Sequence, residues 1–335
     1  MKHILVTGGA GFIGSHLVER LLADGRRVVV IDDLSTGRRE NLRAVKSHPG
    51  LRFVQSKISA CPKLPELAAN AEFIFHLAAT VGVELVVKSA LHVLEASFHE
   101  TQILLRAAAA NHTPLLLTST SEVYGKSAKP AFGEDDDLLI GPPGQSRWSY
   151  ACSKLTDEFL ALAYAREKNL SVTIARLFNT VGPRQTGRYG MVLPRFIAAA
   201  KRNEPLKVFG NGKQTRCFCH VGDAVEALVR LQKVAQASRL PSKSAGGTPA
   251  LRDKYVFGEI FNIGGTEEIS ILELARLVVK MLGSKSKIEL IPYDKAYSPG
   301  FDDMRRRKPL VKKLEQFVKF RPHTPLREII RLTAV

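Results

Sequence analysis

Short apolar runs alternate with longer amphipathic segments through the first half of the chain. The runs are HILVTG, RVVVIDD, LRFVQS, AEFIFHLAA, PLLLTST and LSVTIARLFN. Continuous Val, Ile and Leu runs predict strands that are buried on both faces, and the helix-length segments between them predict crossover helices. The pattern therefore predicts an α/β fold whose doubly wound parallel sheet is covered by helices on both faces.

The second half of the chain is less regular and predicts a smaller C-terminal α/β lobe. RYGMVLPRFIAAAKRNEPLKVFG has the pattern of a helix, a turn and a strand, and SILELARLVVKMLGS that of an amphipathic helix. Ser270 and Glu273 form a predicted capping box at the start of that helix. Residues 236–254, QASRLPSKSAGGTPALRDK, lack any period and separate a helix from a strand. We interpret them as a mobile surface insertion.

Composition is that of an ordinary globular protein. Of the 335 residues, 45% are apolar and 24% charged, and no apolar run approaches the length of about 18 residues that a membrane span needs. The start, MKHILVTGG, leaves no room for a signal peptide before the first strand, so we expect a cytoplasmic protein. The four cysteines include one isolated Cys-x-Cys, which predicts free thiols and no metal site.

The formal net charge of +17 is unevenly spread, with 26 Lys and Arg against 14 Asp and Glu from residue 201 onward. An anionic ligand, nucleic acid or simple solubility would each fit this excess. The chain has no zinc-finger spacing, basic–aromatic ribonucleoprotein motif or basic heptad region. We therefore expect no nucleic-acid partner.

A glycine-rich turn follows the first predicted strand. In VTGGAGFIGSHL, Gly8, Gly11 and Gly14 allow a tight turn, and the helix that begins there directs N–H groups at a pyrophosphate. Asp32, at the end of the next strand, can accept a hydrogen bond from an adenine-ribose diol and would repel a 2′-phosphate. The pattern predicts NAD in preference to NADP, although two arginines follow at 38–39.

Hydroxyl groups and a carboxylate end the strand PLLL, in the stretch TSTSEVYG, and YACSK follows soon after. Tyr150 and Lys154 are four residues apart and share one face of a helix. An ammonium group beside a phenol favours the phenolate and lowers the pKa of tyrosine toward neutrality. Such a tyrosine can remove a proton from a substrate hydroxyl while hydride leaves for a nicotinamide, and Thr120 can hydrogen-bond the same hydroxyl.

These motifs together resemble the extended short-chain dehydrogenases/reductases, the family of nucleotide-sugar epimerases, dehydratases and decarboxylases. The matching pieces are TGGAGFIG, IDDLSTGRREN, HLAATVGV, TSTSEVYG, YACSK, RLFNTVGPR, VFGNGKQTRCFCHVGDAVEAL, FNIGG and FDDMRRRKP. The resemblance implies an NAD-binding Rossmann domain at 1–178, with a returning segment around 217–235, and a nucleotide-sugar lobe at 179–335. It also implies a homodimer formed through helices around 91–110 and 150–168.

The resemblance assigns site residues one by one. The cofactor is expected against Gly8, Gly11, Phe12, Ile13, Gly14, Asp32, Leu77, Ala78, Tyr150 and Lys154. The catalytic set is Thr120, Glu122, Tyr150 and Lys154. The substrate is expected against Ser121, Asn179, Val208, Phe209, Arg216 and Arg307. Within that set Asn179 and Arg216 would contact the phosphates, Val208 and Phe209 would lie beside uracil, and Arg307 would reach the sugar carboxylate.

Glu122 discriminates among reactions. Family decarboxylases and 4,6-dehydratases carry Glu here, whereas many 4-epimerases carry a small or neutral residue. The carboxylate either moves a proton at C5 of the sugar or accepts backbone hydrogen bonds. Dehydration usually needs a second acidic residue beside the glutamate, and this chain has neutral Ser121. The triple arginine at 305–307 resembles the decarboxylase pattern, and within it we choose Arg307.

Three positions depart from the family pattern. Lys57 stands where an Asp usually faces the adenine amino group, and lysine cannot accept that hydrogen bond. Ser97 stands where Asn is usual, near the nicotinamide, and Glu100 where Gly is common. These departures weaken the case for tight NAD binding.

The sequence thus predicts an NAD-dependent enzyme that modifies a UDP-sugar through a 4-keto intermediate, with no metal. The favoured reaction is decarboxylation of UDP-glucuronate to a UDP-pentose. The alternatives are 4-epimerisation of UDP-glucose or UDP-glucuronate, and, less favoured, 4,6-dehydration. Readings from other classes are an NAD-sensing regulator without catalysis and a basic nucleic-acid-binding protein, against which the intact Thr120, Tyr150 and Lys154 argue.

Overall fold

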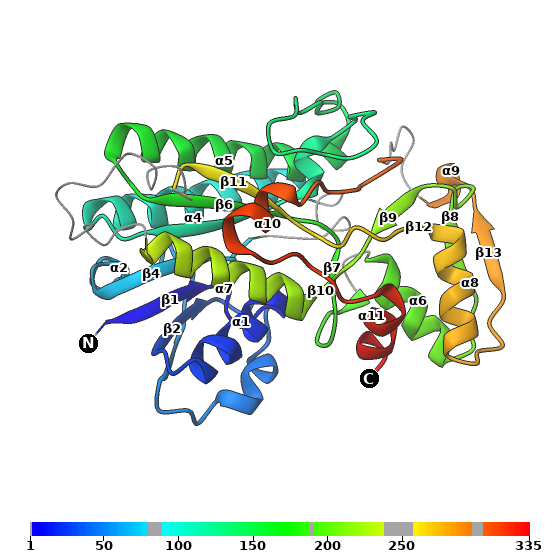
Figure 1. The fold of residues 1–335 in the computed structure, drawn as a ribbon, viewed down its shortest axis with the longest axis horizontal. Coiled ribbons are helices and arrows are strands. Elements are labelled where there is room, and N and C mark those ends of the chain that lie inside the picture. The colour runs from blue at the N-terminus through cyan, green and yellow to red at the C-terminus, as the bar shows by residue number, and fades with distance from the viewer. Residues whose placement is uncertain (1, 80–88, 188–190, 238–256, 297–303) are drawn as a thin grey trace.

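A parallel sheet of seven strands, in the order β11-β6-β5-β4-β1-β2-β3, forms the centre of the molecule (Figure 1). The computed structural model describes residues 2–79, 89–187, 191–237, 257–296 and 304–335. The strands are β1 (His3–Thr7), β2 (Val28–Asp32), β3 (Leu51–Gln55), β4 (Ala71–His76), β5 (Leu115–Thr120), β6 (Val172–Leu177) and β11 (Glu259–Ile263). All six neighbouring pairs are parallel, which confirms the sheet expected from the apolar runs.

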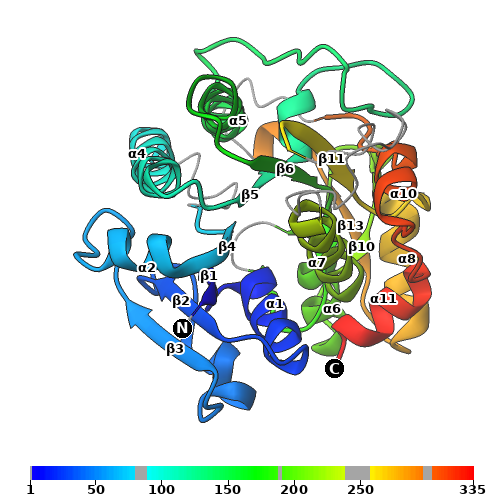
Figure 2. The ribbon, with the colours of Figure 1, turned by 60° about the vertical axis from the view of Figure 1, so that its left-hand side comes forward.

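Helices cover both faces of this sheet (Figure 2). One face carries α1 (Phe12–Ala23), α7 (Val221–Ala237) and α10 (Lys312–Val318), and the other carries α2 (Leu64–Asn70), α4 (Ala90–Ala110) and α5 (Ser149–Lys168). Short 3-10 helices add η1 (Arg39–Val45), η2 (Ser121–Tyr124) and η3 (Ser146–Trp148). The doubly wound architecture is therefore confirmed.

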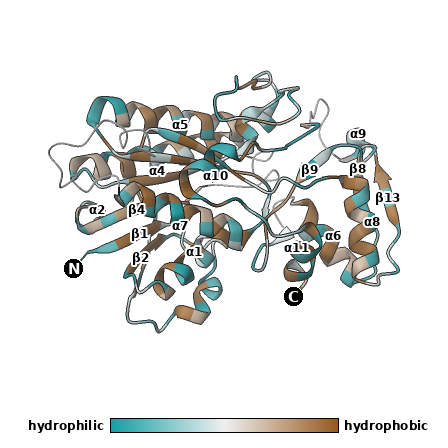
Figure 3. Cartoon of the chain, viewed as in Figure 1, coloured by the Kyte–Doolittle hydropathy of each residue, from teal (hydrophilic) through white to brown (hydrophobic). Residues whose placement is uncertain are grey.

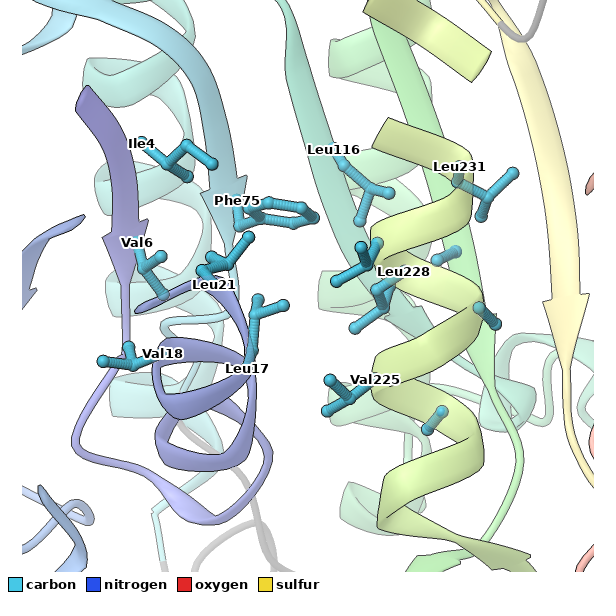
Figure 4. Packing of buried hydrophobic residues seen from close by; sticks show 14 of the residues in the cluster. Ile4, Val6, Leu17, Val18, Leu21, Phe75, Leu116, Val225, Leu228 and Leu231 are labelled. Carbon is cyan, nitrogen blue, oxygen red and sulfur yellow. The ribbon is translucent and has the colours of Figure 1, made fainter. Parts of the chain in front are cut away.

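The core between the sheet, α1 and α7 is built from side chains that the helical period places on one stripe (Figure 4). Leu17 and Leu21 of α1 and Leu228 of α7 point toward Phe75 of β4, and all four are at most 1% exposed. Burying one such side chain stabilises the fold by about 2 kcal/mol. Colouring by hydropathy shows the same division, with apolar residues along the central strands and polar ones on the outer faces of the helices (Figure 3).

The smaller lobe lies at one end of the sheet and has its own core (Figure 1). Its helices are α6 (Val192–Lys201), α8 (Ile271–Met281), α9 (Tyr293–Ala296) and α11 (Leu326–Thr333). Its strands pair in twos: β8 (Leu206–Phe209) with β13 (Ile288–Ile291), β9 (Thr215–Cys217) with β12 (Glu268–Ser270), and β7 (Thr180–Val181) with β10 (Cys219–His220). Ser270 and Glu273 form the predicted capping box of α8.

More of the second half returns to the large sheet than the single segment predicted around 217–235. Besides α7, strand β11 pairs with β6 along the outer edge, and α10 packs on β11 and α7. The apolar run EIFNI was assigned to the smaller lobe because its partner strand lies more than 80 residues earlier, and no local pattern connects the two. The predicted insertion 236–254 lies, from residue 238 on, outside the described residues.

Parallel strands bring their carboxyl ends to one edge of the sheet, and this edge faces the smaller lobe. Thr7, His76 and Thr120 end β1, β4 and β5 there. The strand order reverses between β1 and β4, the point at which open α/β sheets form a crevice for ligands. The fold therefore places the residues singled out in the sequence around a single opening.

Candidate active site

A cavity of about 900 Å³ lies at the carboxyl edge of the sheet and extends against the smaller lobe. It is lined by nearly every residue that the sequence assigned to the site: Gly8, Gly11, Phe12, Ile13, Gly14, Asp32, Leu77, Ala78, Thr120, Ser121, Glu122, Tyr150, Lys154, Asn179, Phe209, Arg216 and Arg307. These residues come from both lobes, so the fold brings distant parts of the chain together at one place.

Val208 is the exception. It is fully buried in the core of the smaller lobe and does not line the cavity, whereas its neighbours Lys207 and Phe209 do. Side chains alternate across a strand, so Val208 and Phe209 of β8 cannot both face the same opening. The side chain of Val208 therefore faces the core of the smaller lobe. The expectation that Val208 lies beside uracil stays a prediction. The guanidinium group of Arg195 stacks on the Phe209 ring, 4.8 Å from the centre of that ring.

The glycine turn leaves room for a ligand at one end of the cavity. Gly8 has a positive φ of 72°, and a Cβ there would lie 2.6 Å from the backbone nitrogen of Ala78. Gly11 is the N-cap of α1 and brings no side chain over the first turn. A turn free of side chains at a helix N-terminus suits a pyrophosphate, as the sequence predicted.

Asp32 ends β2 at the same end of the cavity. Its Oδ2 accepts a hydrogen bond from the Ala10 N–H at 2.8 Å, and its Oδ1 accepts one from the Leu34 N–H at 2.9 Å. Burial raises the pKa of this carboxyl group from its usual value. Of the two arginines that follow, Arg38 lines the cavity, while Arg39 donates to Gln55 and stacks on Phe53 outside it.

The three departures from the family pattern also border the cavity. Glu100 of α4 reaches the loop after β3, where its carboxylate accepts hydrogen bonds from the Ser59 N–H at 2.9 Å and the Ser59 hydroxyl at 2.5 Å. Ser97, one turn earlier on α4, donates from Oγ to Oδ2 of Asp157 on α5 at 2.9 Å. Both polar side chains thus have partners within the fold.

Tyr150 and Lys154 lie on the first turns of α5, beside the end of β5. The hydroxyl of Thr120 hydrogen-bonds the Tyr150 phenol, and Lys154 donates from Nζ to Asp157 Oδ2 at 2.9 Å. The expected lowering of the tyrosine pKa is not found in the protein alone. Burial, followed by the charge of Glu122, raises the pKa of Tyr150. The ammonium of Lys154 is paired with a carboxylate, so its effect on the phenol is offset.

Glu122 lies in η2 between two arginines. Its Oε2 is 2.6 Å from Nη1 of Arg147, and its Oε1 is 2.5 Å from Nη2 of Arg307. All three side chains are largely buried, at 10%, 5% and 12% exposure. Although burial acts in the opposite direction, the charges of Arg147 and Arg307 lower the pKa of Glu122 to about 2. Glu122 is therefore an ionised carboxylate held by guanidinium groups.

Sequence reasoning missed Arg147. It precedes Tyr150 by three residues, and its guanidinium stacks 4.9 Å from the ring centre of Trp148 as well as pairing with Glu122. No local pattern identifies it, because its carboxylate partner lies 25 residues earlier on another element. The choice of Arg307 within the arginine run agrees with the geometry. Arg306 instead pairs with Glu268 at 2.6 Å, and neither Arg305 nor Arg306 lines the cavity.

Asn179 and Arg216 occupy the wall formed by the smaller lobe. Asn179 has a positive φ of 32° and donates from Nδ2 to the carbonyl oxygen of Cys217 at 2.9 Å. Arg216 donates from Nη1 to the carbonyl oxygen of Thr215 at 2.8 Å and adds to the positive field at Glu122. Both side chains border the cavity, and their contact with phosphates stays a prediction.

Fold and site together define a dinucleotide-binding α/β protein with a tyrosine–lysine pair at the carboxyl edge of its sheet. Residues 4–264 match the NAD dependent epimerase/dehydratase family. The chain belongs to this family, whose cofactor is NAD. The bare glycine turn, the buried Asp32 and the cavity between them fit that cofactor.

Similar proteins cover almost the whole chain. A UDP-N-acetyl-alpha-D-glucosaminuronate decarboxylase of Bacillus cytotoxicus is 40% identical over 96% of this chain and 93% of its own length. UDP-glucuronic acid decarboxylase 1 of Xenopus tropicalis is 32% identical over 99% of this chain and 71% of its own length. A solved mutant of UDP-glucuronic acid 4-epimerase from Bacillus cereus, in complex with NAD and a UDP-sugar, superposes with a TM-score of 0.84 at 28% identity, covering 100% of this chain and 98% of that one.

The described helices include none that is long and apolar enough to cross a membrane.

Proposed function

We propose that this protein decarboxylates a UDP-linked uronic sugar through a 4-keto intermediate, with UDP-glucuronate as the first candidate substrate. The observation that carries the proposal is the placement of Glu122 between Arg147 and Arg307, in the same cavity as Tyr150. The 2-acetamido form of the sugar is the second candidate, because the relative that is 40% identical is named for it.

The charge at this end of the cavity supports an anionic sugar. Glu122 pairs with both Arg147 and Arg307, and Arg216 adds further positive field. Guanidinium groups form charge-assisted, often bidentate, hydrogen bonds with carboxylates, so these arginines would stabilise a substrate carboxylate. The hydroxyl groups of a neutral hexose would form weaker hydrogen bonds with them.

The chemistry follows from the position of the tyrosine. NAD, when bound, would supply an acceptor for the hydride from C4 of the sugar and a donor for its return. Tyr150 takes the proton of the C4 hydroxyl, and Thr120, which hydrogen-bonds the phenol, steadies the same oxygen. With a ketone at C4, the carboxylate on C5 is β to a carbonyl. Breaking its bond to C5 releases carbon dioxide and leaves the electron pair in an enolate, which takes up a proton from solvent water at C5. When the hydride returns to C4, Tyr150 gives its proton back to the C4 oxygen.

We assign Glu122 a role other than moving a proton at C5 of the sugar. With a pKa of about 2 it holds no proton near neutral pH and cannot donate one. Instead it fixes Arg147 and Arg307 and places a negative charge close to the carboxylate that leaves. The same ionisation argues against 4,6-dehydration, which needs an acid to expel the C6 hydroxyl, since Ser121 beside it is neutral.

Epimerisation at C4 of a UDP-uronate is the second candidate function. The same arginines would hold its carboxylate, and the solved UDP-glucuronic acid 4-epimerase shares the fold. That reaction needs only a turn of the 4-ketone between the two hydride transfers, with the bond from C5 to the carboxylate kept.

The products separate the candidates. The protein is incubated with NAD and UDP-glucuronate carrying a carbon-13 label at C6, then with the 2-acetamido analogue, then with UDP-glucose. Labelled carbon dioxide with a UDP-pentose supports decarboxylation. A UDP-galacturonate product without gas, or UDP-galactose from UDP-glucose, would replace the proposal with epimerisation. Tyr150→Phe is the control that should abolish either reaction.

We further propose that the protein is a homodimer through α4 and α5, which lie side by side on one face of the sheet (Figure 2). Leu91, Leu94 and Phe98 follow helical spacing on α4 and are 68%, 39% and 38% exposed, and Phe159 of α5 is 64% exposed. A row of exposed apolar side chains on two adjacent helices is typical of a covered face. Solution scattering should give twice the chain mass, and Leu94→Asp with Phe159→Asp should halve it. Leu290→Asp, at an exposed leucine of β13, should leave it unchanged.

A further inference from the structure

A carboxylate that the proposed chemistry does not use lies directly behind Lys154. Asp157 is one turn further along α5 and is fully buried. Its Oδ2 accepts a hydrogen bond from Lys154 Nζ at 2.9 Å and another from Ser97 Oγ of α4, also at 2.9 Å. Lys154 itself lines the cavity, so Asp157 holds a side chain of the candidate site.

Burying the Lys154–Asp157 pair lowers the stability of the fold. Oδ1 of Asp157 is buried and finds no hydrogen-bond partner among the described residues. A buried ion pair with one oxygen unsatisfied contributes little to stability, and an apolar side chain of similar size would pack here without that cost. Costly polar groups are typical of positions that serve the chemistry of a site.

Among the residues that the structure describes, the carboxylate paired with Lys154 is that of Asp157. His76 of β4 is buried, with Nδ1 2.7 Å from Thr7 Oγ1 and Nε2 3.1 Å from Thr101 Oγ1. Burial, followed by the charge of Lys154, lowers the pKa of His76 to about 3, so this ring is neutral near pH 7. Among the described groups that act on Tyr150, Glu122 and Asp157 favour the phenol, while Arg307 and Thr120 favour the phenolate.

We propose that Asp157 is a positioning residue that, together with Ser97, holds the ammonium group of Lys154 and offsets its positive charge at the Tyr150 phenol. The proposal rests on the proposed function, in which Tyr150 takes the proton of the sugar hydroxyl. It also accounts for the departure at position 97. The family pattern has Asn there, near the nicotinamide, whereas the shorter Ser97 of this chain turns its hydroxyl to Asp157.

The consequence concerns the pH at which Tyr150 loses its proton. An ammonium group beside a phenol favours the phenolate, so Lys154 should lower the pKa of Tyr150. The charge of Asp157 acts in the opposite direction and raises that pKa. Removing that charge in Asp157→Asn should move the titration midpoint of Tyr150 to lower pH by about one unit. Ser97→Ala removes a hydrogen bond that stabilises the carboxylate, leaves more of its charge directed at Lys154, and should move the midpoint to higher pH.

The experiment uses two readouts on the NAD-loaded protein. One is the tyrosinate absorbance as a function of pH, taken as the difference from Tyr150→Phe. The other is the acidic limb of kcat/KM for the UDP-uronate. The matched control is Glu158→Gln. Glu158 is the next residue of α5 and is equally buried, but the cation with which it pairs is Arg176, whereas Lys154 pairs with Asp157. It should lower stability and leave both midpoints in place.

Each outcome decides the proposal. Opposite shifts in Asp157→Asn and Ser97→Ala support it, whereas a folded Asp157→Asn with an unmoved or raised midpoint overturns it. If Asp157→Asn does not fold, the direction of the shift in Ser97→Ala decides alone, and an unmoved or lowered midpoint there overturns the proposal. Absence of turnover on every UDP-sugar would count against the proposed function, while the absorbance titration would still decide the role of Asp157.

Discussion

Glu122 and Arg307 meet at 2.5 Å although they lie 185 residues apart in the sequence, in η2 and in the segment before α10. The contact joins the sheet, which carries Glu122 just after β5, to a segment that passes along the smaller lobe. Arg147 completes the group from η3, just before α5. Three elements with no local connection therefore meet at the point where the sugar would be transformed.

Replacing Arg307 should affect the reaction more than the fold. Arg307→Ala removes one of two partners of Glu122 and the cation proposed to meet the substrate carboxylate. We expect kcat/KM for the UDP-uronate to fall by about 100-fold, as for loss of one charge-assisted contact at a reacting centre. Arg306→Ala is the control, because Arg306 pairs with Glu268 away from the cavity. Equal losses in the two variants would contradict the assignment of Arg307.

The Glu122 carboxylate should make stability depend on pH in the acidic range. Its pKa is about 2 in the folded protein and 4.5 in an unperturbed glutamate, so the unfolded chain binds the proton first. The contribution of about 3 kcal/mol is fully present above pH 5 and is lost as pH falls toward 2. Unfolding free energies of the native protein and Glu122→Gln should therefore differ most near neutrality and converge in acid. A difference that is independent of pH would show that the pair is not responsible.

Cofactor selectivity should follow Asp32. A 2′-phosphate would lie against this buried carboxylate, whose two oxygens are already fixed by the Ala10 and Leu34 N–H groups and cannot turn away. We expect NAD to bind at least roughly tenfold more tightly than NADP, a difference of about 1.4 kcal/mol. Calorimetric titration with each cofactor measures the two dissociation constants directly, and equal values would contradict the prediction.

Gly8 and Gly25 have nearly the same φ but different space around them. Replacing each by alanine therefore distinguishes the cost of backbone strain from the cost of a steric clash at Cβ. Gly25 has φ 73° and open space where a Cβ would stand, so Gly25→Ala should cost about 1 kcal/mol of unfolding free energy. Gly8 has φ 72°, but its Cβ would lie 2.6 Å from the backbone of Ala78. Gly8→Ala should therefore cost several kcal/mol more and abolish NAD binding. Denaturant unfolding of the two variants checks the difference, and equal costs would show that the turn can relax.

Local patterns predicted what depends on local physics. The apolar runs gave the parallel sheet, and the strand–turn–helix context of Gly8 and Gly11 gave the cofactor end of the cavity. Pairings across the chain were harder. Arg147 was missed because only the folded chain brings it to Glu122, and β11 was placed in the wrong lobe for the same reason.

Predictions about charge failed where burial decides the outcome. A Tyr-x-x-x-Lys pair in isolation favours the phenolate, but the sequence does not show that Lys154 is paired with Asp157 or that Glu122 lies close by. The direction of a side chain also depends on the fold. Val208 and Phe209 are adjacent in the sequence, but of these two only Phe209 lines the cavity. In each case the deciding quantity is the environment of the side chain.

Arg307 is synthesised later than the other residues of the candidate site. Synthesis proceeds from the N-terminus, and early segments can fold before later ones emerge. The glycine turn, Glu122, Arg147 and Tyr150 are complete long before Arg307 and the last strand of the large sheet. A nascent chain can thus build most of the cofactor site while the reactive end stays unfinished. Arg307 must therefore emerge before it can join Glu122 and Arg147 at the reactive end of the cavity.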